Sequence, residues 1–299
     1  MSQFHTSGDI QVHRFDNGLC LVYQPSPTPI PLTSLQVFCN VGSAFELDGY
    51  RGMAHMVEHM VFKGTQKRMP KEIFELFDKF GADFNAYTTK RLTCYTFKCD
   101  SLYVPQCIPV MADMLFRSTF PKAEYDKEKQ VVEEENIRDK NDEARINYEL
   151  FCRIAYAGNS FMYPVDTLEY HTKKNDWTLK QVREWYRHYY QPQHMVFSVV
   201  SSLPFRQILS LVEKTEFAKK SIAGSQPETE LGLRFPKRFS HSSASSSASS
   251  SSRILPNRMV CEKKKGMTNT HIMLGYPSYD QYDPRRFCMR LVSQLLNGM

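Results

Sequence analysis

The pattern with the most evident chemistry in this 299-residue chain is His55-Met-Val-Glu58-His59. On a helix, residues i and i+4 lie one turn apart on the same face, so both imidazoles could place a nitrogen on one cation. Glu58 shares that face and could take a proton from a water held there. This H-x-x-E-H order is the inverse of the H-E-x-x-H zinc motif. The pattern therefore predicts a zinc site with Glu58 as the general base.

The residues around this motif predict that its helix is buried. From Met53 to Phe62, every position other than the two histidines and Glu58 is apolar, which leaves no polar face for solvent. Ionisable groups on a buried helix are costly unless something compensates them, and Zn²⁺ would do so. The alternative is a histidine pair in the core with a salt-bridged Glu58 and no metal.

A catalytic zinc needs a third protein ligand, and an acidic stretch further along the chain offers candidates. Between Tyr125 and Arg145, Glu128 and Glu135 are seven residues apart, which places them two helical turns apart on one face. Glu133 and Glu134 are expected to face solvent instead. The spacing leaves open which of the first two glutamates would bind the metal.

Three segments resemble the pitrilysin/insulinase class of zinc peptidases, the inverzincins, which include the β-subunit of the mitochondrial processing peptidase. These segments are Gly52–Thr65, Gly81–Thr88 and Glu128–Glu135. In that class the third ligand follows the second histidine by about 76 residues, and Glu135 lies 76 residues after His59. Weaker similarity extends over most of the chain, from about residue 10 to residue 299.

The resemblance implies roles for the candidate residues. His55, His59 and Glu135 are expected to bind one Zn²⁺ per chain, with Glu58 as the catalytic base. Glu128 corresponds to a carboxylate that orients or assists the site.

The resemblance also implies a peptide-binding segment. Asn85 and Ala86 correspond to the strand on which an extended peptide substrate pairs with a sheet edge. In such β-augmentation, main-chain hydrogen bonds hold the peptide with little demand on its sequence.

Composition and pattern indicate the elements that would position these residues. Hydrophobic residues make up 41% and charged residues 23% of the chain, which is typical of a protein with a buried core. Asn17-Gly18 predicts a type I′ turn between strands at 10–15 and 19–24. Thr178 and Gln181 form a capping box for a helix that ends before Pro192. Further extended segments are expected at 35–41, 84–99 and 195–200, and further helices at 49–64, 70–80, 105–120, 123–145, 146–156 and 205–213.

This order of elements predicts an α+β fold with a mainly antiparallel sheet and helices packed on one face. The resemblance implies an α/β-roll. Residues 1–235 are expected to form a zinc-peptidase domain, and the Ser-rich run at 236–253 a linker. Residues 254–299 would then be the incomplete start of a second, homologous domain, with a strand pair at 258–263 and 271–275 and a helix at 284–296.

Members of the class pair two such domains, which close around the substrate. A second homologous domain or subunit is therefore expected as a partner. The short second part leaves three explanations open: a fragment, a partner that supplies the second half, or a minimal form. A fragment is favoured, because an isolated strand pair and helix would expose apolar residues such as Ile272 and Leu274.

The remaining features limit the function classes. The net charge of +6 comes without a block of like charges, so nucleic acid is not an expected partner. No run of 18 apolar residues is present, so no membrane span is expected. The eight cysteines include no C-x-x-C pair and are expected to be buried reduced thiols. The N-terminal residues show no targeting pattern, which favours a cytoplasmic over a mitochondrial location.

The function expected from the sequence is that of a zinc metalloendopeptidase acting on unfolded peptides or targeting segments. The alternative is a non-catalytic peptide-binding or assembly subunit of the same class. Such subunits typically lack residues of the zinc motif, whereas this chain has all of them.

Overall fold

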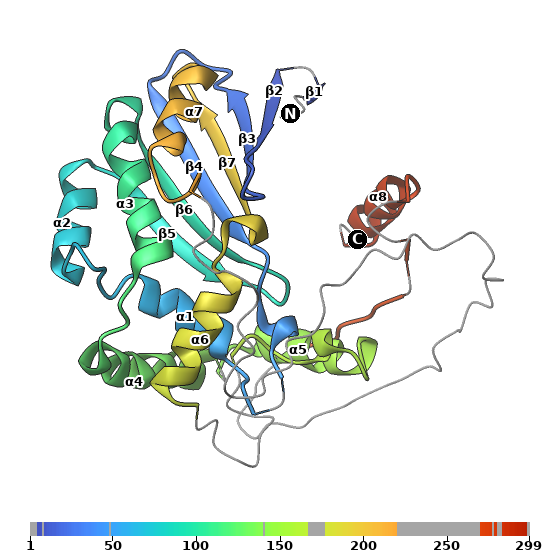
Figure 1. Ribbon diagram of the computed structural model, residues 1–299. Helices are drawn as coiled ribbons and strands as arrows, with labels where there is room; N and C mark the ends of the chain where they lie inside the picture. Colours follow the sequence, from blue (N-terminus) through green and yellow to red (C-terminus); the bar gives the residue numbers. More distant parts are fainter. Residues whose placement is uncertain are drawn as a thin grey trace.

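The computed structural model describes residues 5–7, 9–47, 49–139, 141–166, 177–219, 270–276, 278–279 and 283–297. Within these residues a seven-stranded sheet has the order β1-β2-β3-β7-β4-β6-β5 (Figure 1). Only β3 and β7 pair in parallel, so the sheet is mainly antiparallel, as expected. The strands are β1 (His5–Ser7), β2 (Ile10–Arg14), β3 (Cys20–Pro25), β4 (Leu32–Cys39), β5 (Asp83–Thr88), β6 (Thr93–Asp100) and β7 (Met195–Ser201).

Helices pack on one face of the sheet and beyond one of its ends, which confirms the α+β class. In Figure 1, α2, α3 and α7 lie beside the sheet, whereas α1, α4, α5 and α6 lie at its lower end. None of the helices within the described residues is long and apolar enough to cross a bilayer. The helices are α1 (Met53–Val61), α2 (Pro70–Lys79), α3 (Val104–Arg117), α4 (Lys122–Asp139), α5 (Glu143–Ala155), α6 (Leu179–Tyr189), α7 (Phe205–Glu213) and α8 (Arg286–Asn297).

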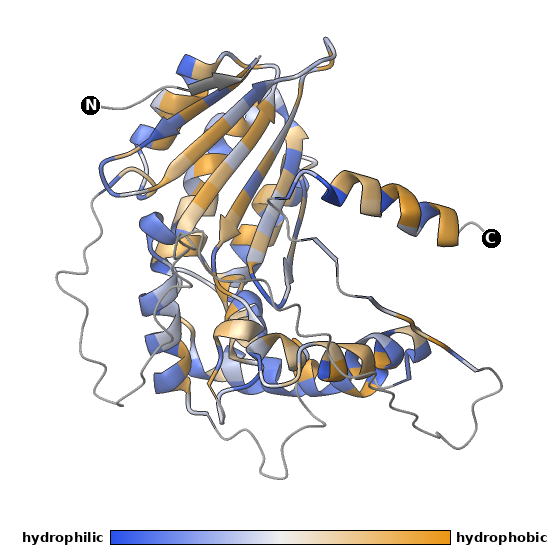
Figure 2. Cartoon of the chain, turned by 90° about the vertical axis from the view of Figure 1, so that its right-hand side faces the viewer, coloured by the Kyte–Doolittle hydropathy of each residue, from blue (hydrophilic) through white to orange (hydrophobic). Residues whose placement is uncertain are grey.

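One hydrophobic core joins the sheet to the helices. In β4, Leu35 and Val37 are fully buried and alternate with partly exposed residues, as a strand with one face in the core requires. They belong to the same cluster as Phe77 of α2, Met111 of α3 and Val57 of α1. Figure 2 shows this hydrophobic character running along the central strands. The helix that carries the histidine motif is thus part of the core.

The hairpin between β2 and β3 differs from the expected type I′ turn. Such a turn needs positive φ at both central residues, but only Gly18 has one, +90°. The Gly18 N–H donates to Phe15 O (2.9 Å), and the Phe15 N–H donates to Leu19 O (3.0 Å). This is a three-residue loop with a glycine bulge. Asn17 instead donates its side-chain amide to Phe217 O (2.8 Å), which ties the hairpin to the segment after α7.

The extended segment expected at 84–99 is two strands joined by a tight turn. The turn Thr89-Lys-Arg-Leu92 contains no glycine, asparagine or proline to mark it. Thr89 holds it instead, because its hydroxyl donates to Leu92 O (2.9 Å) and accepts from Leu92 N–H (3.0 Å).

The helix expected at 123–145 ends earlier, at Asp139, and α5 begins at Glu143. Asp142 is the N-cap of α5, since its side chain accepts a hydrogen bond from the Arg145 N–H (3.1 Å). The charge-rich sequence hides this break because helix-forming residues continue on both sides of it.

The C-terminal helix is present as α8, whereas the described residues include only one half of the expected strand pair, 271–275. Residues 270–276 pair with no strand among the described residues, and a strand requires a ladder partner. Its expected partner at 258–263 and the linker at 236–253 lie outside the described residues. The domain boundaries therefore stay a prediction. Six of the cysteines are buried and free, as expected, whereas Cys288 on α8 is exposed.

The start of α1 depends on a carboxyl group from outside the helix. Gly52 is the N-cap, with φ of +81° and no side chain to cap the helix. Glu46 replaces that cap, accepting hydrogen bonds from the N–H groups of Gly52 (2.9 Å) and Ala54 (2.8 Å). Burial raises the pKa of Glu46 to about 8, while these N–H donors and Arg51 act in the opposite direction.

We expect Glu46→Ala to lower the free energy of unfolding by about 1–3 kcal/mol, because it leaves the buried N–H groups of Gly52 and Ala54 without acceptors. Denaturant unfolding followed by circular dichroism measures the loss. Glu75→Ala on the exposed face of α2 is the control and should change stability by less than about 0.5 kcal/mol. Equal stabilities of the two variants would contradict the capping role.

Candidate metal centre

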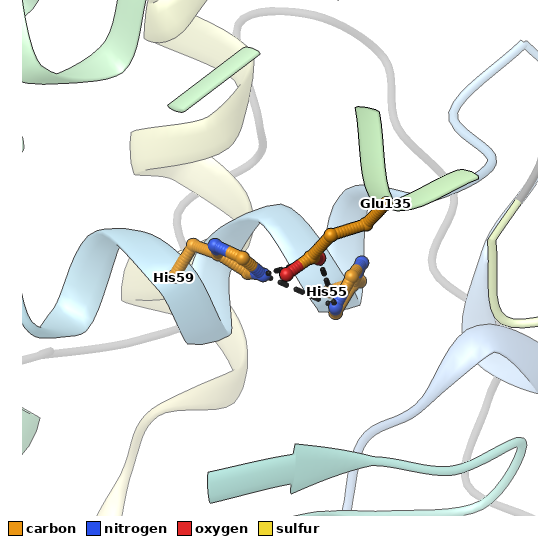
Figure 3. Close-up of side chains that lie close together, drawn as sticks. All are labelled: His55, His59 and Glu135. Carbon is orange, nitrogen blue, oxygen red and sulfur yellow. Dashed lines mark hydrogen bonds and ion pairs between the residues drawn. The ribbon is translucent and has the colours of Figure 1, made fainter. Parts of the chain in front are cut away.

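Helix α1 presents both histidines of the motif to α4. His55 and His59 lie one turn apart, and their Nε2 atoms are 3.2 Å from each other. Glu135 reaches over from α4 and places Oε2 3.3 Å from His59 Nε2 and 3.8 Å from His55 Nε2 (Figure 3). The three side chains are 15%, 16% and 30% exposed, in the order His55, His59, Glu135, so the group opens to solvent on one side.

These separations suit a single zinc ion. Ligand atoms at about 2.0–2.1 Å from a tetrahedral zinc are about 3.3–3.4 Å apart, which is close to the observed spacing. Two imidazoles and a carboxylate form a donor set found in catalytic zinc sites, with one position left open. The residues present thus fit the metal, while their roles as ligands stay a prediction.

Glu128 lies behind His59, on the side away from the other two ligand atoms. Its Oε2 is 2.9 Å from His59 Nδ1, and its Oε1 is 2.6 Å from Lys63 Nζ. Burial tends to raise the pKa of Glu128, but the hydrogen bonds from His59 and Lys63 outweigh it and hold the pKa below its usual value. An ionised Glu128 can only accept, so His59 Nδ1 carries the proton and Nε2 keeps its lone pair for a cation.

The two histidines differ in their electrostatic surroundings. Burial lowers the pKa of His55 to about 3, and the neighbouring His59 and Arg145 act in the same direction. Burial also tends to lower the pKa of His59, but the hydrogen bond with Glu128 and the charges of Glu135 and Glu58 raise it above its usual value. His55 is therefore neutral at neutral pH, which is the form that binds a metal.

Glu58 is buried beside the group and is held by the sheet. Its Oε2 accepts a hydrogen bond from Thr88 Oγ1 (2.5 Å) at the end of β5. Burial raises the pKa of the Glu58 carboxyl, against the opposing effects of Thr88 and His59. A raised pKa moves a carboxylate toward the range in which a general base is efficient at neutral pH.

A cleft of about 800 Å³ opens over these residues. Asn85 and Ala86 lie on its wall. They belong to β5, the last strand of the sheet, and no strand among the described residues pairs with its outer edge. The Ala86 N–H donates to the Asn85 side chain (2.8 Å) rather than to a neighbouring strand. The site thus has an open strand edge where the peptide was expected, although substrate contact by these two residues stays a prediction.

The structure adds residues that sequence reasoning missed. Lys63 could have been found from the sequence, because it follows His59 by four residues, the spacing at which side chains on a helix are neighbours. Thr88 lies in the segment that carried the resemblance, but its contact with Glu58 depends on how β5 packs against α1. Glu133 and Glu134 are exposed, as expected.

The comparisons with known proteins identify the family. The family model of insulinase (peptidase family M16) matches residues 22–165, and that of the peptidase M16 inactive domain matches residues 176–299. The chain belongs to the M16 peptidase family. The resemblance inferred from the three motif segments is thereby confirmed.

Known relatives include proteases and a subunit of a respiratory complex. The chain is 35% identical over 196 residues to the uncharacterized zinc protease YmxG of Bacillus subtilis, covering 65% of this chain and 47% of that protein. It is 22% identical over 288 residues to the mitochondrial cytochrome b-c1 complex subunit 1 of Bos taurus, covering 96% of this chain and 55% of that protein.

A solved structure shares the fold. The crystal structure of a protease from Helicobacter pylori matches with a TM-score of 0.67 and 25% identity, over 73% of this chain and 52% of that one. The chain thus spans about half the length of the relatives it matches.

We expect Glu128→Ala to weaken zinc binding by about 10- to 100-fold, because His59 loses the acceptor that fixes its ring and tautomer. Competition with a zinc-binding dye measures the affinity. Glu134→Ala, on the exposed side of the same helix, should bind zinc like the unaltered chain. An undiminished affinity in the Glu128 variant would show that Lys63 and not His59 is the relevant partner of this carboxylate.

Proposed function

We propose that this chain carries the catalytic zinc site of a metalloendopeptidase that hydrolyses unfolded peptides or targeting segments. The observation that supports this most strongly is the meeting of His55, His59 and Glu135 beside a buried Glu58. One Zn²⁺ per chain would polarise the scissile carbonyl and acidify the attacking water. The zinc-protease names of relatives support the same class.

Glu58 supplies the proton transfer in this proposal. Thr88 holds Oε2, and Oε1 of this cleft-lining carboxyl would accept a proton from the attacking water. The same carboxyl can then pass that proton to the leaving amine. Burial keeps bulk water from competing for the carboxylate, and its raised pKa favours this acceptance and release near neutral pH.

The open edge of β5 would orient the peptide. An extended chain that adds to this edge would form main-chain hydrogen bonds to residues such as Ala86, after the Asn85 side chain gives up its own bond to the Ala86 N–H. Such pairing demands an extended, unfolded segment and little particular sequence. A second homologous domain or subunit would close the cleft over the bound peptide.

A non-catalytic assembly subunit is the second candidate. The similarity to the bovine respiratory subunit over 96% of this chain favours it. The presence of all three candidate ligands and of Glu58 favours the peptidase.

We expect Glu58→Gln to retain one zinc per chain while its rate of peptide hydrolysis falls by at least about 100-fold, because the glutamine cannot take up the proton. Cleavage of an unfolded, fluorogenic peptide library and the metal content by atomic absorption measure the two effects. Glu134→Gln is the matched control and should keep full activity.

The unaltered chain separates the two candidates. Zinc binding together with cleavage that a chelator abolishes and added zinc restores supports the peptidase. Zinc binding with no cleavage of any library peptide would contradict it and favour the assembly subunit.

A further inference from the structure

A second carboxylate lies behind the other histidine. Asp166 Oδ1 is 3.1 Å from His55 Nδ1, and the two side chains are 10% and 15% exposed. The approach is close but not aligned as a hydrogen bond, and His55 Nδ1 is otherwise buried without a partner. Asp166 therefore faces the one ring nitrogen of His55 that points away from Glu135.

Asp166 is itself held in place by an arginine side chain. Arg145 of α5 pairs with Asp166 through one guanidinium nitrogen and with Asp139 through the other. Asp139 is the last residue of α4, the helix that also carries Glu135. This chain of contacts fixes the Asp166 carboxylate between a guanidinium group and an imidazole, both of which can donate to it.

The two histidines thus have matching surroundings. Behind His59 stand Glu128 and then Lys63, and behind His55 stand Asp166 and then Arg145. A histidine that binds a metal usually donates its second N–H to such an acceptor, which sets the tautomer and the orientation of the ring.

We propose that Asp166 is a positioning residue that fixes His55 for the metal. In the zinc-loaded chain its carboxylate accepts a hydrogen bond from the His55 Nδ1–H, and the Nε2 lone pair stays directed at Glu135 and His59. Arg145 in turn holds the carboxylate. The inference rests on the zinc site of the proposed function and extends it to a residue outside the motif segments.

A purely structural role is the alternative. Asp166 could serve only as a partner of Arg145, which ties the segment before residue 167 to α5. Asp139 offers a matched control because it pairs with the same guanidinium group and lies on the wall of the same cleft, yet has no contact with His55 among the described ion pairs.

The test compares zinc affinities in the 299-residue chain. We expect Asp166→Ala to bind zinc about 10- to 100-fold more weakly and Asp139→Ala to bind it within about threefold of the unaltered chain. Asp166→Asn keeps an acceptor oxygen in the same place and should fall between them. Because asparagine has the size and shape of aspartate, Asp166→Asn also tests the inference if the alanine variant does not fold.

Nitrogen NMR of the imidazoles provides a readout that a structural role would not move. In the zinc-loaded chain, Asp166→Asn should shift the Nδ1–H resonance of His55 and leave that of His59 in place. Unchanged affinity and an unmoved His55 resonance would overturn the inference, as would equal losses in the Asp139 and Asp166 variants. If the unaltered chain binds no zinc, the proposed function fails and this inference fails with it. That outcome is seen in the unaltered chain before any variant is measured, so the two failures can be told apart.

Discussion

The removal of three ionisable groups on α1 from most of their contact with water is the constraint on which the rest of the site depends: Glu58 is buried, and His55 and His59 are partly buried. His55, Glu58 and His59 share a helix whose apolar residues are almost fully removed from water. A charged or polar group in such a place needs a partner, because the protein interior does not replace the lost hydration. Helix α4 and strand β5, which both contact α1, supply such partners.

Helix α4 and strand β5 supply different partners to the same helix. From α4, Glu135 faces both imidazoles and Glu128 supports one of them. From β5, Thr88 holds the carboxyl of Glu58. Strand β5 is also the edge strand that lines the cleft. The strand that is expected to bind the peptide therefore also positions Glu58, which is expected to act on that peptide. A shift of β5 would therefore disturb both peptide binding and the position of Glu58.

The sequence predicted most of the elements, and its errors have identifiable physical causes. The helical patterns at 70–80 and 205–213 placed α2 and α7 to within a residue, whereas the almost wholly apolar segment at 49–64 predicted α1 with ends a few residues too long. The break between α4 and α5 was expected between residues 145 and 146 and lies at 140–142, because only the N-cap Asp142 marks it within a run of helix-forming residues. The turn at Thr89–Leu92 was missed because a threonine side chain, and not a glycine, holds it. Both errors concern the hydrogen bonds of a single side chain, which leave little trace in composition.

What the sequence determined by itself is the local geometry of the motif. The spacing of His55 and His59 on a helix and that of Glu128 and Glu135 on another follow from 3.6 residues per turn, whatever the rest of the chain does. Only the tertiary structure decided that the two helices meet face to face, that β5 is an edge strand, and that Asp166 and Arg145 stand behind His55. Those contacts join residues far apart in the chain, and their formation depends on burial of the whole core, which no local pattern records.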